Sequence, residues 1–186
     1  MAEHGVCPGW AGYFLASPLR KLVHSRVRIL APYVRAGMTV LEPGPGMGFF
    51  TLELARLVGP RGRVVVVDVQ PEMIAALRRR AKRAGLLDRI EARVGLATTM
   101  ALDAYDGAVD FVLAFAVVHE TPSAENFFAE AARAMKPGGS LLFAEPAGHV
   151  SKEDFESELA LAAQAGLAAV ARPTIRRSQA ALLRKS

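Results

Sequence analysis

Short apolar runs alternate with segments of helical periodicity along most of the chain, and this alternation limits the fold more than any other feature. The runs are rich in valine and leucine, as at residues 64–67 and 111–113, and glycine, proline or aspartate bounds them. Strands that are apolar at nearly every position are buried on both faces, which is typical of parallel sheets covered by helices. The sequence therefore predicts an α/β fold with a doubly wound, mostly parallel sheet.

The positions of these elements follow from the same pattern and from the residues that bound them. The strands are predicted at residues 39–42, 63–68, 89–94, 109–114 and 140–145. The helices are predicted at residues 17–30, 49–58 and 71–84, then from Ser123 to before Lys136 and from Ser151 to near Gly166. Ser123 and Ser151 are the expected N-caps, and the Pro-Gly-Gly sequence after Lys136 predicts a turn. Two last strands, at residues 167–175 and 179–183, predict a C-terminal antiparallel hairpin and complete a set of seven strands.

The length of 186 residues lies within the usual range for one domain. No linker, internal repeat or break in composition divides the chain. We therefore expect a single domain over residues 1–186, with an N-terminal helical arm or lid at 1–36 and the core at 37–186. Trp10, Tyr13 and Phe14 are candidates either to close over a pocket or to fix the arm to the core.

Composition excludes several classes of protein. No uninterrupted apolar stretch of about 20 residues is present, and residues 1–12 lack the pattern of a signal peptide. We therefore expect a cytoplasmic protein without membrane insertion. Cys7 is the single cysteine, which rules out an internal disulfide and a CxxC site, so no metal is expected.

Positive charge is concentrated in two runs, at residues 78–83 and 172–185. The formal net charge is +5 and the pI is near 9.8, which would suit an acidic partner. The favoured interpretation is a solvated helix end, where basic side chains complement the helix dipole, and a solvated hairpin. Binding of nucleic acid is the alternative and is not favoured.

A glycine-rich segment follows the first predicted strand and precedes a helix. Its spacing is Gly44-x-Gly46-x-Gly48, which differs from the GxGxxG of nicotinamide sites, and it lacks the Gly-Lys-Ser/Thr of phosphate-binding loops. Glycines at such a turn let a ligand approach the backbone closely. The carboxylate of Glu42, two positions earlier, would repel a pyrophosphate and favours a cationic ligand.

Three stretches extend the pattern around these glycines, namely residues 40–51 (VLEPGPGMGFFT), 110–120 (DFVLAFAVVHE) and 131–142 (AARAMKPGGSLL). In this order they resemble three motifs of the class I S-adenosylmethionine-dependent methyltransferases. The first resembles the family's first motif, the second its fourth motif in the branch that ends with a histidine, and the third its late helix, turn and strand. The resemblance implies a Rossmann-like, seven-stranded fold and an enzyme that uses S-adenosylmethionine and releases S-adenosylhomocysteine.

The resemblance also implies a role for each residue of the cofactor site. Glu42 and the glycine loop would hold the amino-acid portion, Asp68 the ribose hydroxyls, and Gly95 with Leu96 the adenine. The implied cofactor-binding residues are Glu42, Gly44, Pro45, Gly46, Gly48, Asp68, Val69, Gly95, Leu96 and Ala114. Gly95-Leu96-Ala97 departs from the family, which often has an acidic residue there. Capping of the helix that begins at Pro71 is the alternative role of Asp68.

His119 ends the stretch that resembles the fourth motif, at the rim where ligands of open α/β sheets bind. A histidine at this place could act as a catalytic base, because its ordinary pKa is near neutrality. The alternative is that His119 and Glu120 only line the pocket or cap the following segment.

The expected function is methyl transfer to a small-molecule acceptor. The Asn/Asp-Pro-Pro-aromatic motif of adenine N-methylating relatives is absent, and Cys7 alone cannot form the arsenic site of arsenite methyltransferases. An RNA methyltransferase is the first alternative, and a non-catalytic S-adenosylmethionine-binding module or partner subunit is the second. A second subunit could complete the pocket, so a homodimer is among the expected assemblies.

Overall fold

The computed structural model describes residues 25–186, which group into two compact units. We name them the N-terminal unit, residues 25–96, and the C-terminal unit, residues 97–186. Trp10, Tyr13 and Phe14, with their predicted roles in the arm, and the first part of the helix predicted at 17–30 lie outside the described residues. The single-domain organisation and the cytoplasmic location stay predictions.

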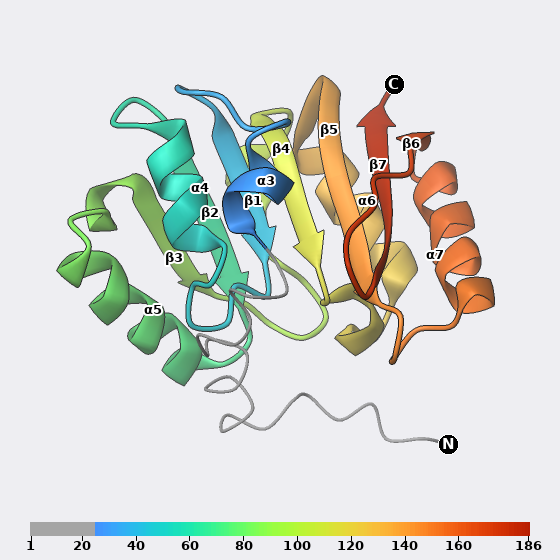
Figure 1. Cartoon of the computed structure of the whole chain (residues 1–186), viewed down its shortest axis with the longest axis horizontal. Coiled ribbons are helices and arrows are strands. Elements are labelled where there is room, and N and C mark those ends of the chain that lie inside the picture. Colours follow the sequence, from blue (N-terminus) through green and yellow to red (C-terminus); the bar gives the residue numbers. More distant parts are fainter. Residues whose placement is uncertain (1–24) are drawn as a thin grey trace. The chain divides into compact units, whose positions relative to one another are not determined.

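The N-terminal unit is built around three parallel strands. Its elements in chain order are α3 (Arg26–Leu30), β1 (Thr39–Pro43), α4 (Thr51–Val58), β2 (Arg63–Asp68), α5 (Pro71–Arg83), η1 (Leu87–Arg89) and β3 (Ile90–Val94). The strands pair in the order β3-β2-β1, with Val40 opposite Val64 and Val66 opposite Ala92. Figure 1 shows these strands side by side, with α5 along β3.

Burial and terminal residues explain why this unit forms the predicted elements. The valines at residues 64–67 of β2 expose 5% of their surface or less, as expected for a strand covered on both faces. Pro71 takes the first position of α5, where a backbone N–H is not needed. Gly59 and Gly85 follow α4 and α5 with φ angles of +67° and +65°, so both helices end at the predicted glycines.

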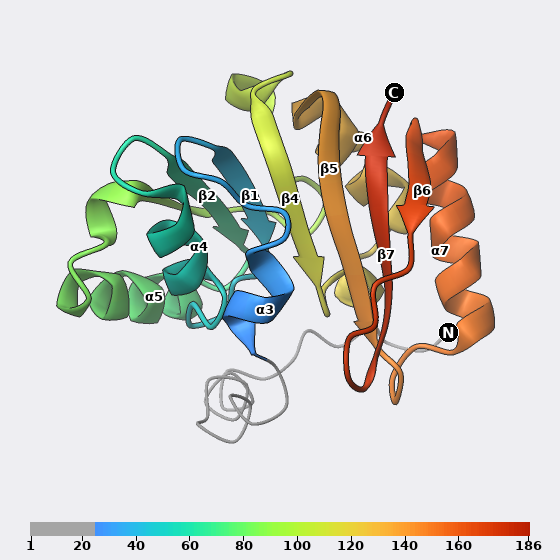
Figure 2. The same cartoon turned by 45° about the horizontal axis from the view of Figure 1, so that its top comes forward.

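The C-terminal unit combines parallel and antiparallel strands. Its elements are η2 (Asp103–Tyr105), β4 (Val109–Phe115), η3 (Val118–Glu120), α6 (Ala124–Ala134), β5 (Met135–Pro146), α7 (Lys152–Gln164), β6 (Leu167–Ala171) and β7 (Ser178–Lys185). The strand order is β4-β5-β7-β6; β4 and β5 are parallel, and β7 is antiparallel to both of its neighbours. Figure 2 shows α7 alongside β6.

Aromatic packing and helix caps stabilise the C-terminal unit. Phe143 of β5 stacks on Phe155 of α7 with ring centroids 4.7 Å apart, and it meets Phe128 of α6 edge-to-face at 5.4 Å. All three rings are buried. The side chains of Ser123 and Ser151 each accept a hydrogen bond from the backbone N–H three residues later. Both predicted N-caps are therefore confirmed.

The turn predicted at the Pro-Gly-Gly sequence falls on residues that belong to β5. This strand already begins at Met135, directly after α6, and Met135 pairs with Val109 of β4. The register shifts between Val109 and Phe111 of β4, where β5 carries extra residues and forms a bulge. Gly138 has a φ of +75°, and a Cβ on Gly139 would lie 2.9 Å from a backbone oxygen. These glycines therefore shape a bulge within a strand.

The C-terminal hairpin forms as predicted, with shifted boundaries. β6 ends at Ala171, ahead of Pro173, whose nitrogen carries no hydrogen for a strand pairing. β7 begins at Ser178, and a bridge between Ile175 and Ser178 closes the turn.

The predicted fold class is confirmed. The described residues form an α/β structure with seven strands, mostly parallel, and a C-terminal antiparallel hairpin. No helix within residues 25–186 is long and apolar enough to cross a membrane.

Candidate functional site

The glycine loop of the N-terminal unit joins β1 to α4 in a backbone conformation that side chains disfavour. Gly44, Gly46 and Gly48 have φ angles of +62°, +53° and +81°, in the left-handed region where glycine has no steric penalty. Among residues 25–186, a Cβ on Gly46 would meet nothing within 4 Å, whereas one on Gly48 would lie 3.2 Å from the Leu77 side chain of α5. Gly48 therefore allows the loop to pack on α5, and no described residue covers the Cα side of Gly46.

Glu42 anchors the base of this loop. It lies in β1 with 4% of its surface exposed, and its carboxylate accepts a 2.6 Å hydrogen bond from the hydroxyl of Thr51. Thr51 is fully buried and begins α4. The bond connects the strand before the loop to the helix after it, and sequence reasoning did not single out Thr51 for this role.

Asp68, at the end of β2, connects two loops. Its Oδ2 accepts a hydrogen bond from the Gly46 N–H at 3.2 Å and its Oδ1 accepts one from the Gln70 N–H at 2.9 Å. Burial raises the pKa of this carboxyl, and the backbone hydrogen bonds partly oppose the rise. The N-cap of α5 is Gln70, without a side-chain cap bond. Asp68 therefore holds the glycine loop and does not cap the helix.

Exposed apolar side chains border Asp68. Val69 follows it directly with 39% of its surface exposed, and the end of β3 presents Val94 at 53% and Leu96 at 69%. The Gly95 N–H donates to the Asp68 carbonyl at 3.0 Å, which ties the loop after β3 to the end of β2. These residues form an apolar border suited to the face of an aromatic ring.

Two arginines support the glycine loop, and sequence reasoning assigned neither of them to it. Arg26 donates to the Phe49 carbonyl at 3.4 Å and lies over the Phe49 ring at 5.2 Å from its centroid. Arg80 donates to the Met47 carbonyl. Burial and the positive charge of Arg26 lower the pKa of Arg80. Both guanidinium groups therefore face the same loop.

The expectation of a solvated basic run on α5 does not hold for Arg80, which is only partly exposed and binds the glycine loop. Arg78, Arg79, Lys82 and Arg83 are exposed, as predicted, although Arg78 also donates to the Ala92 carbonyl of β3 at 2.6 Å.

In the C-terminal unit, the structure places Ala114 inside β4 and His119 after it. Ala114 is fully buried and lies opposite Phe143 of β5, so its side chain is part of the core. His119 belongs to η3, and the Thr121 hydroxyl closes that turn by donating to the Val118 carbonyl at 2.7 Å. His119 is therefore held in a short, internally bonded helical turn.

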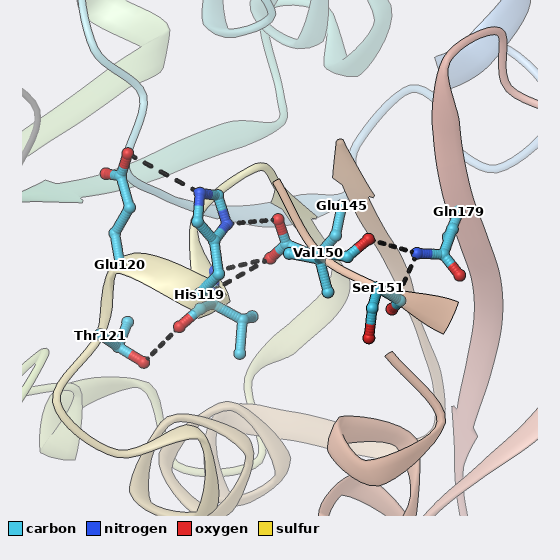
Figure 3. A network of polar contacts seen from close by, with 8 residues as sticks. His119, Glu120, Thr121, Glu145, Val150, Ser151 and Gln179 are labelled. Atoms are coloured by element: carbon cyan, nitrogen blue, oxygen red, sulfur yellow. Dashed lines mark hydrogen bonds and ion pairs between the residues drawn. The ribbon is translucent and has the colours of Figure 1, made fainter. Parts of the chain in front are cut away.

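A buried carboxylate orients the His119 ring, as Figure 3 shows. The His119 Nδ1 lies 2.6 Å from Oε2 of Glu145, at the end of β5, and Glu145 is fully buried. The other oxygen, Oε1, accepts hydrogen bonds from the N–H groups of Val118 at 2.8 Å and His119 at 3.4 Å. One carboxylate thus fixes both the backbone and the ring of the histidine.

The surroundings of His119 favour its charged form. The hydrogen bond to Glu145 raises the pKa of His119 against the opposing effect of burial, and the charges of Glu145, Glu120 and Glu158 add to the rise. Glu120 Oε1 lies 4.0 Å from His119 Nε2. Burial raises the pKa of Glu158 to about 7. The His149 ring is at 5.9 Å, edge-to-face.

Sequence reasoning placed Glu145 only at a strand end and missed its contact with His119. A signal was present, since a carboxylate directly follows the apolar residues 141–144 of a buried strand. A charge at such a place needs a partner to offset its burial.

Two hydrogen bonds link three of the predicted cofactor residues of the N-terminal unit. The Asp68 carboxylate accepts from the Gly46 N–H, and the Asp68 carbonyl accepts from the Gly95 N–H. Ala114 and His119 lie in the C-terminal unit. Among residues 25–186, no group of three or more His, Cys, Asp or Glu is arranged to hold a metal ion.

Comparisons with known proteins identify the family of the chain. Residues 40–139 match the family model described as a methyltransferase domain. An arsenite methyltransferase of Aquipseudomonas alcaligenes is 32% identical over 150 residues, which cover 74% of this chain and 42% of that protein. A ubiquinone/menaquinone biosynthesis C-methyltransferase of Hahella chejuensis is 36% identical over 113 residues, or 60% of this chain and 44% of that protein. The chain thus spans less than half the length of these two relatives.

Solved structures show the same fold. A SAM-dependent methyltransferase from Aquifex aeolicus superposes with a TM-score of 0.86 at 23% identity, covering 97% of this chain and all of that one. The match confirms the Rossmann-like fold. With the family model matching more than half of the chain, the protein belongs to the class I S-adenosylmethionine-dependent methyltransferases, the family and cofactor that its motifs predicted.

Proposed function

We propose that the protein transfers the methyl group of S-adenosylmethionine to a small-molecule acceptor. The observation that carries the proposal is the glycine loop, whose Gly46 N–H is held by Asp68 while no residue among 25–186 covers its Cα side. A ligand can reach the backbone there without displacing a side chain.

The residues of the N-terminal unit fit the chemistry of this cofactor. Asp68 accepts one backbone N–H on each oxygen, and each carboxylate oxygen retains capacity to accept a ribose hydroxyl. Leu96 and Val69 offer exposed apolar surface for the adenine. The buried charge of Glu42 at the base of the loop favours a cationic ligand.

S-adenosylmethionine supplies an electrophilic methyl group on a sulfonium, so the protein needs mainly to bind, orient and exclude water. The glycine loop, Asp68 and Leu96 would bind and orient the cofactor. We place the acceptor beside His119, whose ring is already fixed by Glu145.

The small-molecule class of acceptor is supported by the relatives. Their names point to arsenite and to ubiquinone/menaquinone biosynthesis. Within this chain, Cys7 is the single cysteine, which makes arsenic a poor choice of acceptor.

Calorimetry with S-adenosylhomocysteine tests the cofactor site. We expect wild type to bind and Asp68→Ala to lose a few kcal/mol of affinity, because two ribose hydrogen bonds and the hold on Gly46 disappear together. Asp68→Asn separates the loss of the ribose hydrogen bonds from the loss of the hold on Gly46, since the amide oxygen can still accept one N–H. Asp88→Ala, an exposed aspartate of the same unit, is the control and should bind like wild type. Failure of folded wild type to bind would overturn the proposal.

Release of S-adenosylhomocysteine across a panel of acceptors tests the acceptor class. Turnover with phenols, thiols, amines or carbon acids is expected, and turnover with RNA alone would contradict the small-molecule proposal.

A further inference from the structure

We infer that the atom methylated by this protein carries a dissociable proton in the free acceptor, that His119 Nε2 removes this proton, and that Glu145 is the residue that positions His119 to do so. The inference rests on the proposed function, because it names the acceptor class of that same site.

The first support is the rigidity of Glu145. Its side chain is fully buried at the end of β5, and both oxygens are bonded, Oε1 to the Val118 N–H at 2.8 Å and Oε2 to the His119 ring at 2.6 Å. A carboxylate fixed by its own strand and by a backbone donor cannot turn to follow the ring. The ring therefore follows the carboxylate, and its orientation is set before any ligand binds.

The second support is the tautomer that this contact imposes. An ionised carboxylate only accepts hydrogen bonds, so neutral His119 must carry its proton on Nδ1 and donate it to Glu145. The lone pair is then on Nε2. Glu120 lies 4.0 Å from Nε2, which is too far for a hydrogen bond but close enough to stabilise a positive ring. The His119 side chain is 21% exposed and that of Glu145 is not exposed at all, so the ring and not its partner can meet a ligand.

The third support is what such a base can contribute to methyl transfer. A nucleophile without a proton, such as a thioether, a tertiary amine or arsenic(III), forms its new bond to carbon and has nothing to give to Nε2. A hydroxyl, a thiol or an acidic C–H must lose its proton as the bond forms. In that case the electron pair of the acceptor forms the new bond to the methyl carbon, the pair of the breaking carbon–sulfur bond stays on sulfur, and the proton passes to Nε2. The imidazolium then releases the proton to water.

Glu145 could instead serve only as a cap for the N–H groups of η3, and the Glu145→Gln substitution distinguishes the two roles. The amide oxygen that it introduces would still accept the Val118 N–H, so a cap role is largely preserved. The amide is uncharged, so it cannot stabilise the imidazolium. With its oxygen on the Val118 N–H, its NH2 group faces Nδ1 as a donor and no longer holds the ring proton there. A purely structural role predicts little change in the titration of His119, whereas the positioning role predicts a clear one.

Nitrogen NMR of the imidazoles provides a readout that does not depend on turnover. His119 is assigned by comparison with His119→Asn. We expect neutral His119 in wild type to carry its proton on Nδ1, and we expect its pKa to fall in Glu145→Gln. The groups that face the ring are Glu145 from β5, Glu120 from η3, Glu158 from α7 and His149 from the segment after β5. Glu125→Gln, an exposed change on α6, should leave the titration unchanged.

Single-turnover rates on the acceptors of the panel complete the test. His119→Asn should lower the rate roughly 100-fold or more while S-adenosylhomocysteine binds within about twofold of wild type. The wild-type rate should rise with pH as His119 becomes neutral, and the midpoint should move to lower pH in Glu145→Gln.

Three results would overturn the inference. They are a neutral ring protonated on Nε2, an unchanged His119 titration in Glu145→Gln, and faster turnover with dimethyl sulfide or trimethylamine than with every proton-bearing acceptor. Failure of wild type to bind S-adenosylhomocysteine would instead overturn the proposed function, and the NMR result would still report on the contact between His119 and Glu145.

Discussion

Replacing Glu158 by glutamine is expected to stabilise the protein at high pH and not at low pH. Glu158 lies in α7, and its Oε2 atom is buried without a hydrogen-bond partner among residues 25–186. Burial, with the nearby charge of Glu145, raises the pKa of Glu158 from 4.5 to about 7. The folded protein therefore holds a proton at pH values where the unfolded chain has released it.

The sign and size of the effect follow from this difference. The unfolded carboxyl loses its proton near pH 4.5 and the folded one near pH 7, so the free energy of unfolding falls as pH rises through this interval. The raised pKa would correspond to roughly 3.4 kcal/mol in a fully enclosed site, at about 1.4 kcal/mol for each pKa unit. Because Glu158 is only half-buried, solvent screening reduces the expected penalty to about 1 kcal/mol.

Urea unfolding at about pH 3.5, below the pKa of the unfolded carboxyl, and at about pH 8.5 measures this penalty. Glu158→Gln should raise the free energy of unfolding by about 1 kcal/mol at the higher pH and leave it nearly unchanged at the lower one. Glu153→Gln is the matched control, because Glu153 is an exposed acid in the first turn of the same helix. Glu153→Gln should slightly lower the free energy of unfolding at high pH, because it removes a favourable interaction between the Glu153 charge and the helix dipole. An equal gain from Glu158→Gln at both pH values would refute the reasoning, since ionisation could not be its cause.

Two further substitutions test the glycine loop and a helix cap. Gly46→Ala should weaken S-adenosylhomocysteine binding roughly tenfold or more, because a side chain at φ +53° costs about 1 kcal/mol and enters the space left for the ligand; unchanged affinity by calorimetry would contradict this use of Gly46. Ser151→Ala should lower the free energy of unfolding by about 1 kcal/mol in urea. If Ser157→Ala, at an exposed serine of α7 outside the cap, costs as much, the cap bond is not the reason.

Local sequence was sufficient to predict most of the elements. The valines of β2 predicted its bounds because burial on both faces requires an unbroken apolar run. Ser123 and Ser151 predicted the starts of α6 and α7 because a cap bond spans only three residues. The Pro-Gly-Gly sequence predicted irregular backbone but not the start of β5 at Met135, because glycine and proline do not show whether the chain already pairs with a neighbouring strand.

The parts of the candidate site that sequence missed depend on contacts between distant positions. His119 was selected, but Glu145, which orients it, is 26 residues away on another strand. Arg80 was assigned to a solvated run, because helical spacing alone does not show that its side chain reaches the Met47 carbonyl, 33 residues earlier. Such contacts follow from how strands and helices pack, which residue spacing does not determine.

The buried polar residues identify the site by a route that is independent of motifs. Within residues 25–186, the buried polar or charged residues are Glu42, Thr51, Asp68 and Glu145. Burying a carboxylate is costly unless it is fully paired, so a chain that only had to fold would place apolar residues there. Instead each carboxylate stands at or near the end of a strand and holds the segment that begins a candidate binding surface, namely the start of α4, the glycine loop or the turn of His119. The cost of their burial is best explained by the need to fix these segments before a ligand arrives.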